Sequence, residues 1–414
     1  MADLVHLRLA AEAPAIHSEV GRLRTVVMHR PDLAHERITA APPRDRLFDD
    51  VVWVRGARQE FDALVELLHR HGVEVLLLHD LLSETLEDPA AREWLLSRRL
   101  RPEEVTAVLC DDLAAWMRPM PAAELAARLT EGVTARELPA DAGPSRRRAL
   151  RPADFVIAPV PNQLFTRDTS AWVAGGVALA TMTSAARRKE ALNLEVIYRH
   201  HPRFRGAAPV LFGGADHDWG EATLEGGDVM ALGEGVVLVG QGDRTSAAAA
   251  SILAANLFAA GAARLVIGAR LPRAHASRHL DTALAFCDRD VVAVREPVVS
   301  AILPVRYRPD GDGGVAAELS ERLLLDELRD ELGLGDLRVI AAESGELDPA
   351  SVRSGAGIGI VAVAPGVVVA DERNENFNHR LADAGVEVHA AAVQELARAR
   401  DGAHCITCPI LRDA

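Results

Sequence analysis

The chain has 414 residues, of which 49% are hydrophobic and 26% charged, and its net charge is −14. This length suits one large domain or two to three ordinary ones, and the charge argues against nucleic-acid or anionic-membrane partners while favouring a cationic substrate. No apolar run is long enough for a membrane helix, the first residues lack a signal-peptide pattern, and four cysteines are too few for a disulfide framework. We therefore expect a cytoplasmic protein.

A short pattern recurs along the chain, in which an amphipathic helix ends on glycine and a β-branched strand follows almost at once. Glycine suits the helix end because it accepts the left-handed cap conformation. The pattern predicts helices at 61–68, 249–260, 323–332 and 379–384, followed by strands at 72–76, 265–267, 337–340 and 385–388.

Paired apolar strands joined by glycine-containing turns precede two of these helices. The pairs lie at 228–239 and 359–369, and such turns between apolar runs are typical of hairpins. The repeated unit is therefore strand, strand, helix, strand. Its recurrence favours a cyclic or propeller-like α/β domain, with ordinary α/β alternation as the alternative.

Residues 80–150 break this pattern, because they are rich in Leu, Ala, Glu and Arg and poor in β-branched runs. Helical spacing is found at 81–82, 94–96, 105–109 and 125–129, and the segment closes with a loop at 139–148. We expect an α/β body formed by 1–79 and 151–414, with 80–150 as a helical insertion.

Four polar patches stand out against the Ala, Val and Leu background. Alone, each has an ordinary explanation as a turn, a hairpin, a solvated edge or a small buried thiol. Together they are more specific, because a thiol nucleophile needs a histidine that is distant in sequence, and carboxylates from several segments suit a planar guanidinium. If extended, the third patch places its His and Asp on one face. The patches are 162–168, 224–228, 279–281 and His404–Cys405.

The Cys405–Cys408 spacing is also compatible with a metal site or a redox-active cysteine pair. A zinc site normally needs four ligands, and no second cysteine pair lies nearby. His404 adjoins Cys405 and is expected to point to the opposite face of an extended chain. A thioredoxin-type motif opens a helix, whereas Pro409 follows Cys408 here. We therefore favour Cys405 as a nucleophile.

The order and spacing of many short motifs resemble the bacterial arginine deiminases, within the guanidino-group-modifying superfamily. The resemblance covers nearly the whole chain. The motifs are HSEVGRL at 17–23, MHRP at 28–31, FTRD at 165–168, RR at 187–188, IYRHHP at 197–202, EGGD at 225–228, DRTS at 243–246, HLD at 279–281 and HCITCP at 404–409.

This resemblance implies a five-fold pseudosymmetric α/β propeller that hydrolyses L-arginine to L-citrulline and ammonia without metal or organic cofactor. We also expect a homo-oligomer. By motif match, Cys405 is the nucleophile, His279 the general acid and base, and Asp168 and Asp281 hold the guanidinium, while Glu225 pairs with His279 and substrate. The positions that resemble those binding or gating the amino-acid end are Asn162, Phe165, Arg187, Arg244 and Arg400.

Residues 351–359 and 370–372 depart from the family pattern, although no core catalytic position lies there. Other readings stay open at this point. One is a different guanidino enzyme, such as an agmatine deiminase, a methylarginine hydrolase or an amidinotransferase. Another is a weakly catalytic arginine-binding protein.

Overall fold

The computed structural model describes residues 14–37, 52–101, 110–139, 150–272, 279–342, 358–396 and 402–414. Arg400, the helical pattern at 105–109 and most of the departing loop at 351–359 lie outside these ranges. Within them, no helix has both the length and the apolar character needed to cross a membrane.

One pairing pattern recurs in five sheets of the described residues, where an antiparallel strand pair is joined by a third, parallel strand. The triplets are β19 (Cys408–Arg412), β1 (Leu23–Met28) and β2 (Glu74–Leu77); β5 (Ser170–Val173), β6 (Gly176–Leu179) and β7 (Val210–Phe212); β8 (Val229–Gly233), β9 (Val236–Gln241) and β10 (Leu265–Arg270); β11 (Leu284–Asp288), β12 (Val291–Val294) and β15 (Arg338–Ala341); and β16 (Val361–Ala364), β17 (Val367–Asp371) and β18 (Glu387–Ala391). The third triplet continues into β13 (Leu303–Pro309) and β14 (Val315–Leu319).

A helix precedes the parallel strand of each triplet, as the strand–strand–helix–strand pattern predicts. These helices are α2 (Val54–Arg70), α9 (Arg188–His200), α10 (Ala247–Ala259), α12 (Leu324–Glu331) and α14 (Glu375–Asp383). The short helix α1 (Leu33–Glu36) precedes α2 on the same connection, and the short helix α11 (Glu296–Val299) lies between β12 and β13. The predicted helices and strands of all four glycine-ended repeats, and both hairpins, are confirmed, with helix α2 beginning seven residues earlier than predicted.

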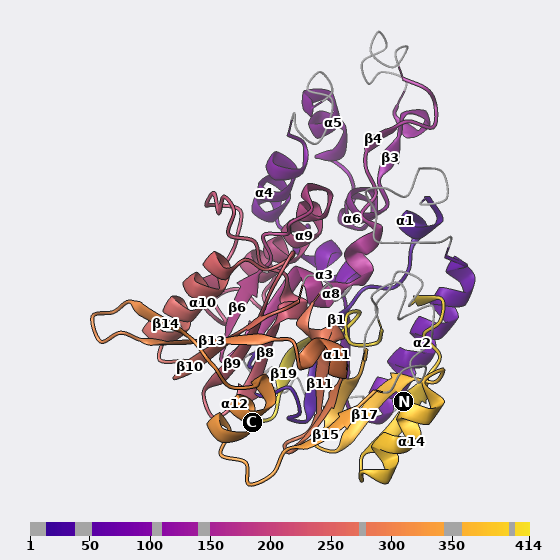
Figure 1. The fold of residues 1–414 in the computed structure, drawn as a ribbon. Coiled ribbons are helices and arrows are strands. Elements are labelled where there is room, and N and C mark those ends of the chain that lie inside the picture. The colour runs from indigo at the N-terminus through magenta and orange to yellow at the C-terminus, as the bar shows by residue number, and fades with distance from the viewer. Residues whose placement is uncertain are drawn as a thin grey trace, which may run out of the picture.

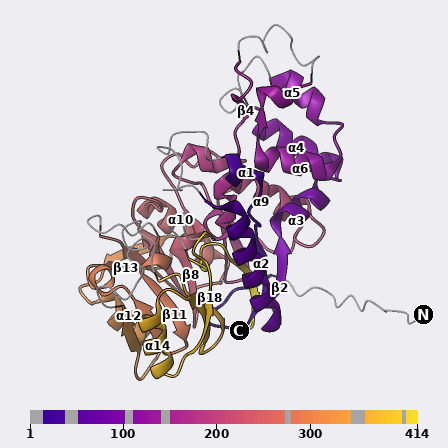
Figure 2. The same ribbon diagram turned by 90° about the vertical axis from the view of Figure 1, so that its right-hand side faces the viewer.

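The helices between the first and second triplets lead away from β2 to one end of the molecule (Figures 1 and 2). They are α3 (Leu78–Thr85), α4 (Pro89–Arg99), α5 (Cys110–Met117) and α6 (Ala122–Glu131). The sequence did not predict the short strands β3 (Val133–Thr134) and β4 (Phe155–Ile157), which pair after these helices. Two-residue pairing leaves too little alternation to detect in the sequence.

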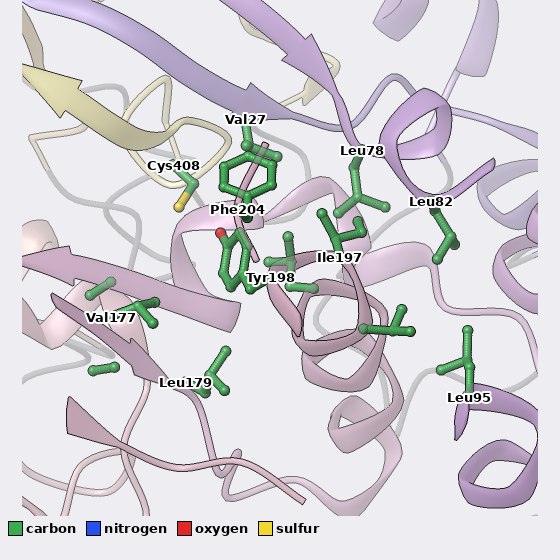
Figure 3. Close-up of a cluster of buried hydrophobic side chains, with 14 of the residues drawn as sticks. Val27, Leu78, Leu82, Leu95, Val177, Leu179, Ile197, Tyr198, Phe204 and Cys408 are labelled. Atoms are coloured by element: carbon green, nitrogen blue, oxygen red, sulfur yellow. The ribbon is translucent and has the colours of Figure 1, made fainter. Parts of the chain in front are cut away.

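The largest apolar cluster joins these helices to the second triplet. Trp172 and Tyr198 pack edge to face with ring centroids 5.2 Å apart, and Tyr198 and Phe204 do the same at 5.2 Å. Figure 3 shows Leu78, Leu82 and Leu95, from α3 and α4, around Ile197 of α9 in this cluster. Burying this apolar surface therefore ties the helical end to α9, the helix that begins next to Arg187.

The polar patches predicted from the sequence precede the first strands of four triplets. Helix α8 (Thr166–Thr169) leads into β5, the 3₁₀ helix η7 (Gly226–Asp228) into β8, and the 3₁₀ helix η8 (Leu280–Thr282) into β11. The turn at 403–406 leads into β19. Segment η7 contacts both α8 and η8, and the turn is joined to α8 by a backbone hydrogen bond from Arg167 to Cys405, so equivalent ends of separate repeats meet at one place.

Candidate active site

The thiol of Cys405 meets a carboxylate that comes from a distant segment. Its Sγ donates to Oδ2 of Asp281 at 3.3 Å, and Nδ1 of His404 lies 2.8 Å from the same oxygen. All three side chains are buried. The prediction that His404 points away from Cys405 was wrong, because residues 403–406 form a turn, and the turn directs both side chains to Asp281.

His279 lies between two further carboxylates of the predicted set. Its Nε2 is 2.8 Å from Oε2 of Glu225, and its Nδ1 is 3.5 Å from Oδ1 of Asp168. Burial by itself lowers the pKa of His279, but Asp168 and the Glu225 hydrogen bond outweigh it and raise that pKa to about 10. Burial likewise opposes ionisation of Glu225, yet His279 and the nearby arginines lower its pKa to about 2. The pair is therefore an imidazolium against a carboxylate at neutral pH.

His279 and Asp281 do not lie on an extended strand, as assumed from their spacing. Residues 280–282 form the 3₁₀ helix η8, with His279 just before it. Both side chains nevertheless lie against the backbone at Gly227. A Cβ built at Gly227 would lie 3.0 Å from the His279 ring and 3.1 Å from Oδ2 of Asp281. Gly227 thus lets η7 approach both groups closely.

Asp168 holds an arginine of the protein itself. Nη1 of Arg187 donates to Oδ2 of Asp168 at 2.8 Å, and Nε donates to Oε2 of Glu190 at 2.9 Å. Nη1 also lies 3.6 Å from Oε2 of Glu225, and the Arg187 side chain is fully buried. Burial outweighs the Arg187 charge at Glu190 and raises the pKa of that carboxyl to about 7. Oδ2 of Asp168 is therefore occupied by a guanidinium of the protein itself.

Arg244 approaches the site from its more open side. Its Nη1 donates to both oxygens of Glu225, at 3.2 and 3.1 Å. Unlike Arg187, its side chain is partly exposed, at 17%. Asn162 and Phe165 are buried on the segment that leads into α8, and Oδ1 of Asn162 has no hydrogen-bond partner among the described residues.

Several buried polar atoms around Cys405 have no hydrogen-bond partner within the described part of the chain. They are Oδ1 of Asp168, Oδ1 of Asp281, Nδ1 of His279 and Nη2 of Arg187. A buried polar atom left without a partner costs about 1–3 kcal/mol, so such a cluster indicates a place for a polar ligand. The two carboxylate oxygens suit N–H donors, as a guanidinium provides.

Comparison with known proteins places the chain in a family. Residues 45–412 match the family model described as arginine deiminase. The chain belongs to the arginine deiminase family.

Solved structures of guanidino-modifying enzymes share its fold at low sequence identity. A dimethylarginine dimethylaminohydrolase variant from Pseudomonas aeruginosa, complexed with citrulline, is 14% identical with a TM-score of 0.53, over 94% of this chain and 99% of that one. SxtG, an amidinotransferase from Microseira wollei, is 12% identical with a TM-score of 0.56, over 97% and 98%. The N-terminal domain of an ArgZ variant, covalently bound to a reaction intermediate, is 12% identical with a TM-score of 0.54, over 94% and 98%.

Two carboxylates to which the sequence assigned no role, Glu190 and Asp228, also contact the residues of the site. Glu190 lies one helical turn after Arg187, a spacing that places side chains on one helix face. Asp228 accepts from Thr245 Oγ1 at 2.6 Å and from the backbone N–H of Leu280 at 2.8 Å, and burial raises its pKa to about 6. Asp228 thereby fixes the backbone between His279 and Asp281.

Among the residues that the structure describes, two sets of three side chains place possible metal ligands within 4.8 Å of one another. They are Asp281, His404 and Cys405, and Asp168, Glu225 and His279. In both sets hydrogen bonds already join the ligand atoms, and an ion would have to displace the protons at His404 Nδ1 and His279 Nε2. That this family member needs no metal stays a prediction.

Cys408 faces a different environment from Cys405. Its Sγ lies 3.5 Å from Oγ of Ser170, whose Oγ is 3.0 Å from the Tyr198 hydroxyl, and burial raises its pKa. Figure 3 shows Cys408 among the apolar side chains near Tyr198. The two cysteines therefore contact separate groups.

We expect Cys408→Ser to keep most of the activity of the wild-type protein. Serine is smaller than cysteine and can hydrogen-bond to Ser170, so it should be accommodated at this position. Citrulline formation by the purified variant is the measurement, with the melting temperature as a folding control. A near-total loss of activity in a folded variant would mean that the two cysteines act together.

Proposed function

We propose that this protein is an arginine deiminase, which hydrolyses L-arginine to L-citrulline and ammonia through a covalent intermediate on Cys405. The observation that carries the proposal is the Cys405 thiol hydrogen-bonded to Asp281, beside carboxylate oxygens of Asp168 and Asp281 that have no partner among the described residues. The thiol and the open carboxylate oxygens suit attack on a bound guanidinium.

In the first half of the proposed reaction, Cys405 loses its thiol proton to solvent as the cationic substrate binds, and the thiolate attacks the guanidinium carbon and forms a carbon–sulfur bond. Surrounding carboxylates oppose the thiolate, whereas a bound cation favours it, so substrate binding assists the activation. Nε2 of His279 faces Glu225, which leaves the proton on Nδ1 for the departing nitrogen. Protonation by His279 lets ammonia leave and gives an amidino-thioether on Cys405.

In the second half, His279 is neutral and takes a proton from water. The resulting hydroxide attacks the amidino-thioether carbon, the carbon–sulfur bond breaks, and citrulline leaves. Glu225 retains its hydrogen bond to His279 and stabilises each imidazolium that forms. Asp168 and Asp281 hold the planar group in one orientation through both steps, which supplies the positioning contribution to the rate.

The proposed contacts to the amino-acid end of the substrate come mainly from arginine side chains. Arg244 is paired with Glu225 but is partly exposed, so it can also reach a substrate carboxylate, whereas the buried Arg187 is bound to Asp168 and Glu190. The occupied state of Arg187 keeps an agmatine deiminase as the second candidate, because agmatine has no carboxylate. We assign Arg244 and Nη2 of Arg187 to the arginine carboxylate, with Asn162, Phe165 and Arg400 as further predicted contacts.

A substrate panel tests the proposed function. The purified protein, treated with EDTA, is incubated separately with arginine, agmatine and a methylarginine, and citrulline and ammonia are measured. We expect equal amounts of citrulline and ammonia from arginine and at least tenfold less product from agmatine, since a carboxylate–arginine pair contributes a charge-assisted interaction of about 1.5–3 kcal/mol.

The other outcomes identify the alternatives. Product from agmatine in place of arginine would favour the agmatine enzyme, and arginine binding without turnover would favour a binding protein. If EDTA abolishes activity and added zinc restores it, the protein requires a bound metal ion. Transfer of the amidino group to an added amine would indicate an amidinotransferase.

We further propose that the five strand triplets close into a propeller, with residues 80–150 inserted between the first and second. The support is that β5 contacts both β8 and β19, β11 contacts β16, and β16 contacts β1. A cytoplasmic location and a homo-oligomeric state also stay predictions.

A further inference from the structure

A chain of buried charged side chains runs behind Cys405 and has no assigned role in the proposed reaction. Oε2 of Glu19 accepts from Nη2 of Arg167 at 2.9 Å, and the same Nη2 lies 2.7 Å from Nε2 of His404. Nδ1 of His404 then lies 2.8 Å from Oδ2 of Asp281, the oxygen that accepts from Cys405. All of these side chains are buried.

The chemistry of the guanidinium decides which nitrogen of His404 carries the proton. An arginine has donors and no acceptor, so Nε2 of His404 must accept from Arg167. A neutral imidazole that accepts at one nitrogen carries its proton on the other. His404 therefore donates Nδ1–H to Asp281, whose Oδ2 accepts from both His404 and Cys405.

We propose that Arg167 is a positioning residue, which fixes His404 as the neutral Nδ1–H tautomer and so holds Asp281 with Oδ2 toward Cys405 and Oδ1 open for substrate. The role given to Oδ1 rests on the proposed function, whereas the tautomer of His404 does not. Arg167 is also tied to the nucleophile through its backbone, since its N–H donates to the carbonyl of Cys405 at 3.1 Å.

Arg167 is needed because His404 otherwise lies between two carboxylates. Oε2 of Glu19 is 3.6 Å from Nε2 of His404, on the side opposite to Asp281. Burial by itself raises the pKa of Glu19, but the charge of Arg167 is the largest of the effects that lower that pKa, so Glu19 is ionised at neutral pH. Without the Arg167 guanidinium, Glu19 and Asp281 would draw a second proton onto His404.

The other charged and titratable groups that face this chain come from neighbouring elements. Arg412 of β19 and Cys408 act on Glu19 and Arg167, and His279 acts on Asp281. None of these groups lies between Arg167 and His404 at hydrogen-bond distance in the described residues. Arg167 is therefore the group to change.

The test is the protonation state of His404, read by ¹⁵N NMR of histidine-labelled protein, with His404→Gln used to assign the resonance. In the wild-type protein at neutral pH, we expect a protonated Nδ1 and an unprotonated Nε2. In Arg167→Met we expect both nitrogens to be protonated at the same pH. Adding Glu19→Gln to Arg167→Met should return His404 to the neutral form.

Two single variants serve as matched controls. Arg167→Lys keeps a cationic donor and should keep the wild-type tautomer, whereas Glu19→Gln leaves Arg167 in place and should do the same. A wild-type His404 that is doubly protonated, or that carries its proton on Nε2, would overturn the proposal even if Arg167→Met does not fold. An unchanged His404 in folded Arg167→Met would overturn it as well.

This readout is independent of turnover. If the protein releases no citrulline, the proposed function fails while the tautomer measurement still stands. If citrulline forms but His404 behaves otherwise, the role of Arg167 fails alone. Activity adds a further check, because citrulline formation should fall more in Arg167→Met than in Arg167→Lys.

Discussion

Replacing Cys405 with alanine is expected to lower kcat for citrulline formation by about 10⁴-fold or more, since removing a nucleophile that forms a covalent intermediate removes both steps of the reaction. The fold should survive, because Asp281 Oδ2 keeps the His404 donor when the thiol is removed. The measurement is steady-state citrulline formation, together with arginine binding by calorimetry.

The binding measurement separates chemistry from recognition. Arginine should still bind to Cys405→Ala, because the carboxylates that hold the guanidinium are intact. Quenched wild-type reactions should carry, on the peptide that contains Cys405, the mass of arginine less ammonia. Citrulline formation that survives in Cys405→Ala at the wild-type rate would sink the assignment of the nucleophile.

Replacing His279 with glutamine is expected to lower kcat by about 10²- to 10⁴-fold, the usual contribution of a general acid and base. Glutamine can keep a hydrogen bond to Glu225, so the loss should arise from the missing proton transfer more than from misfolding. Single-turnover kinetics should show slower release of both ammonia and citrulline. Equal rates in the two proteins would move the acid–base role to another residue.

The difference in stability between the wild type and His279→Gln, measured as a function of pH, tests whether His279 is charged in the folded protein. The pKa of His279 is raised from 6.5 to about 10 in the folded protein. The resulting stabilisation is fully present below about pH 6.5 and is lost as pH rises through about 10. The free energy of unfolding of the wild type, relative to His279→Gln, should therefore fall across that window. A pH-independent difference would mean that His279 is not held as an imidazolium.

The repeats could be predicted from the sequence, and the polar patches that meet at the candidate site could be located in it, because both depend on local patterns. Glycine-ended helices followed by β-branched strands gave correct elements, and clusters such as Glu225–Asp228 stood out against an apolar background. The pairing of β3 with β4 and the turn at His404 were not predicted, because short strands and tight turns produce little periodicity of apolar residues in the sequence.

Composition, repeat pattern and motif order by themselves determined the α/β class and the family resemblance and singled out Cys405 as the predicted nucleophile, because these features depend on residue types and spacings. Tertiary structure alone decided which charges meet. It placed Arg187 on Asp168, joined His404 to the same Asp281 oxygen as Cys405, and separated Cys408 from the site. Such contacts join residues up to 238 positions apart, as in the Ser170–Cys408 pair, and arise from packing of the repeats, which no local pattern records.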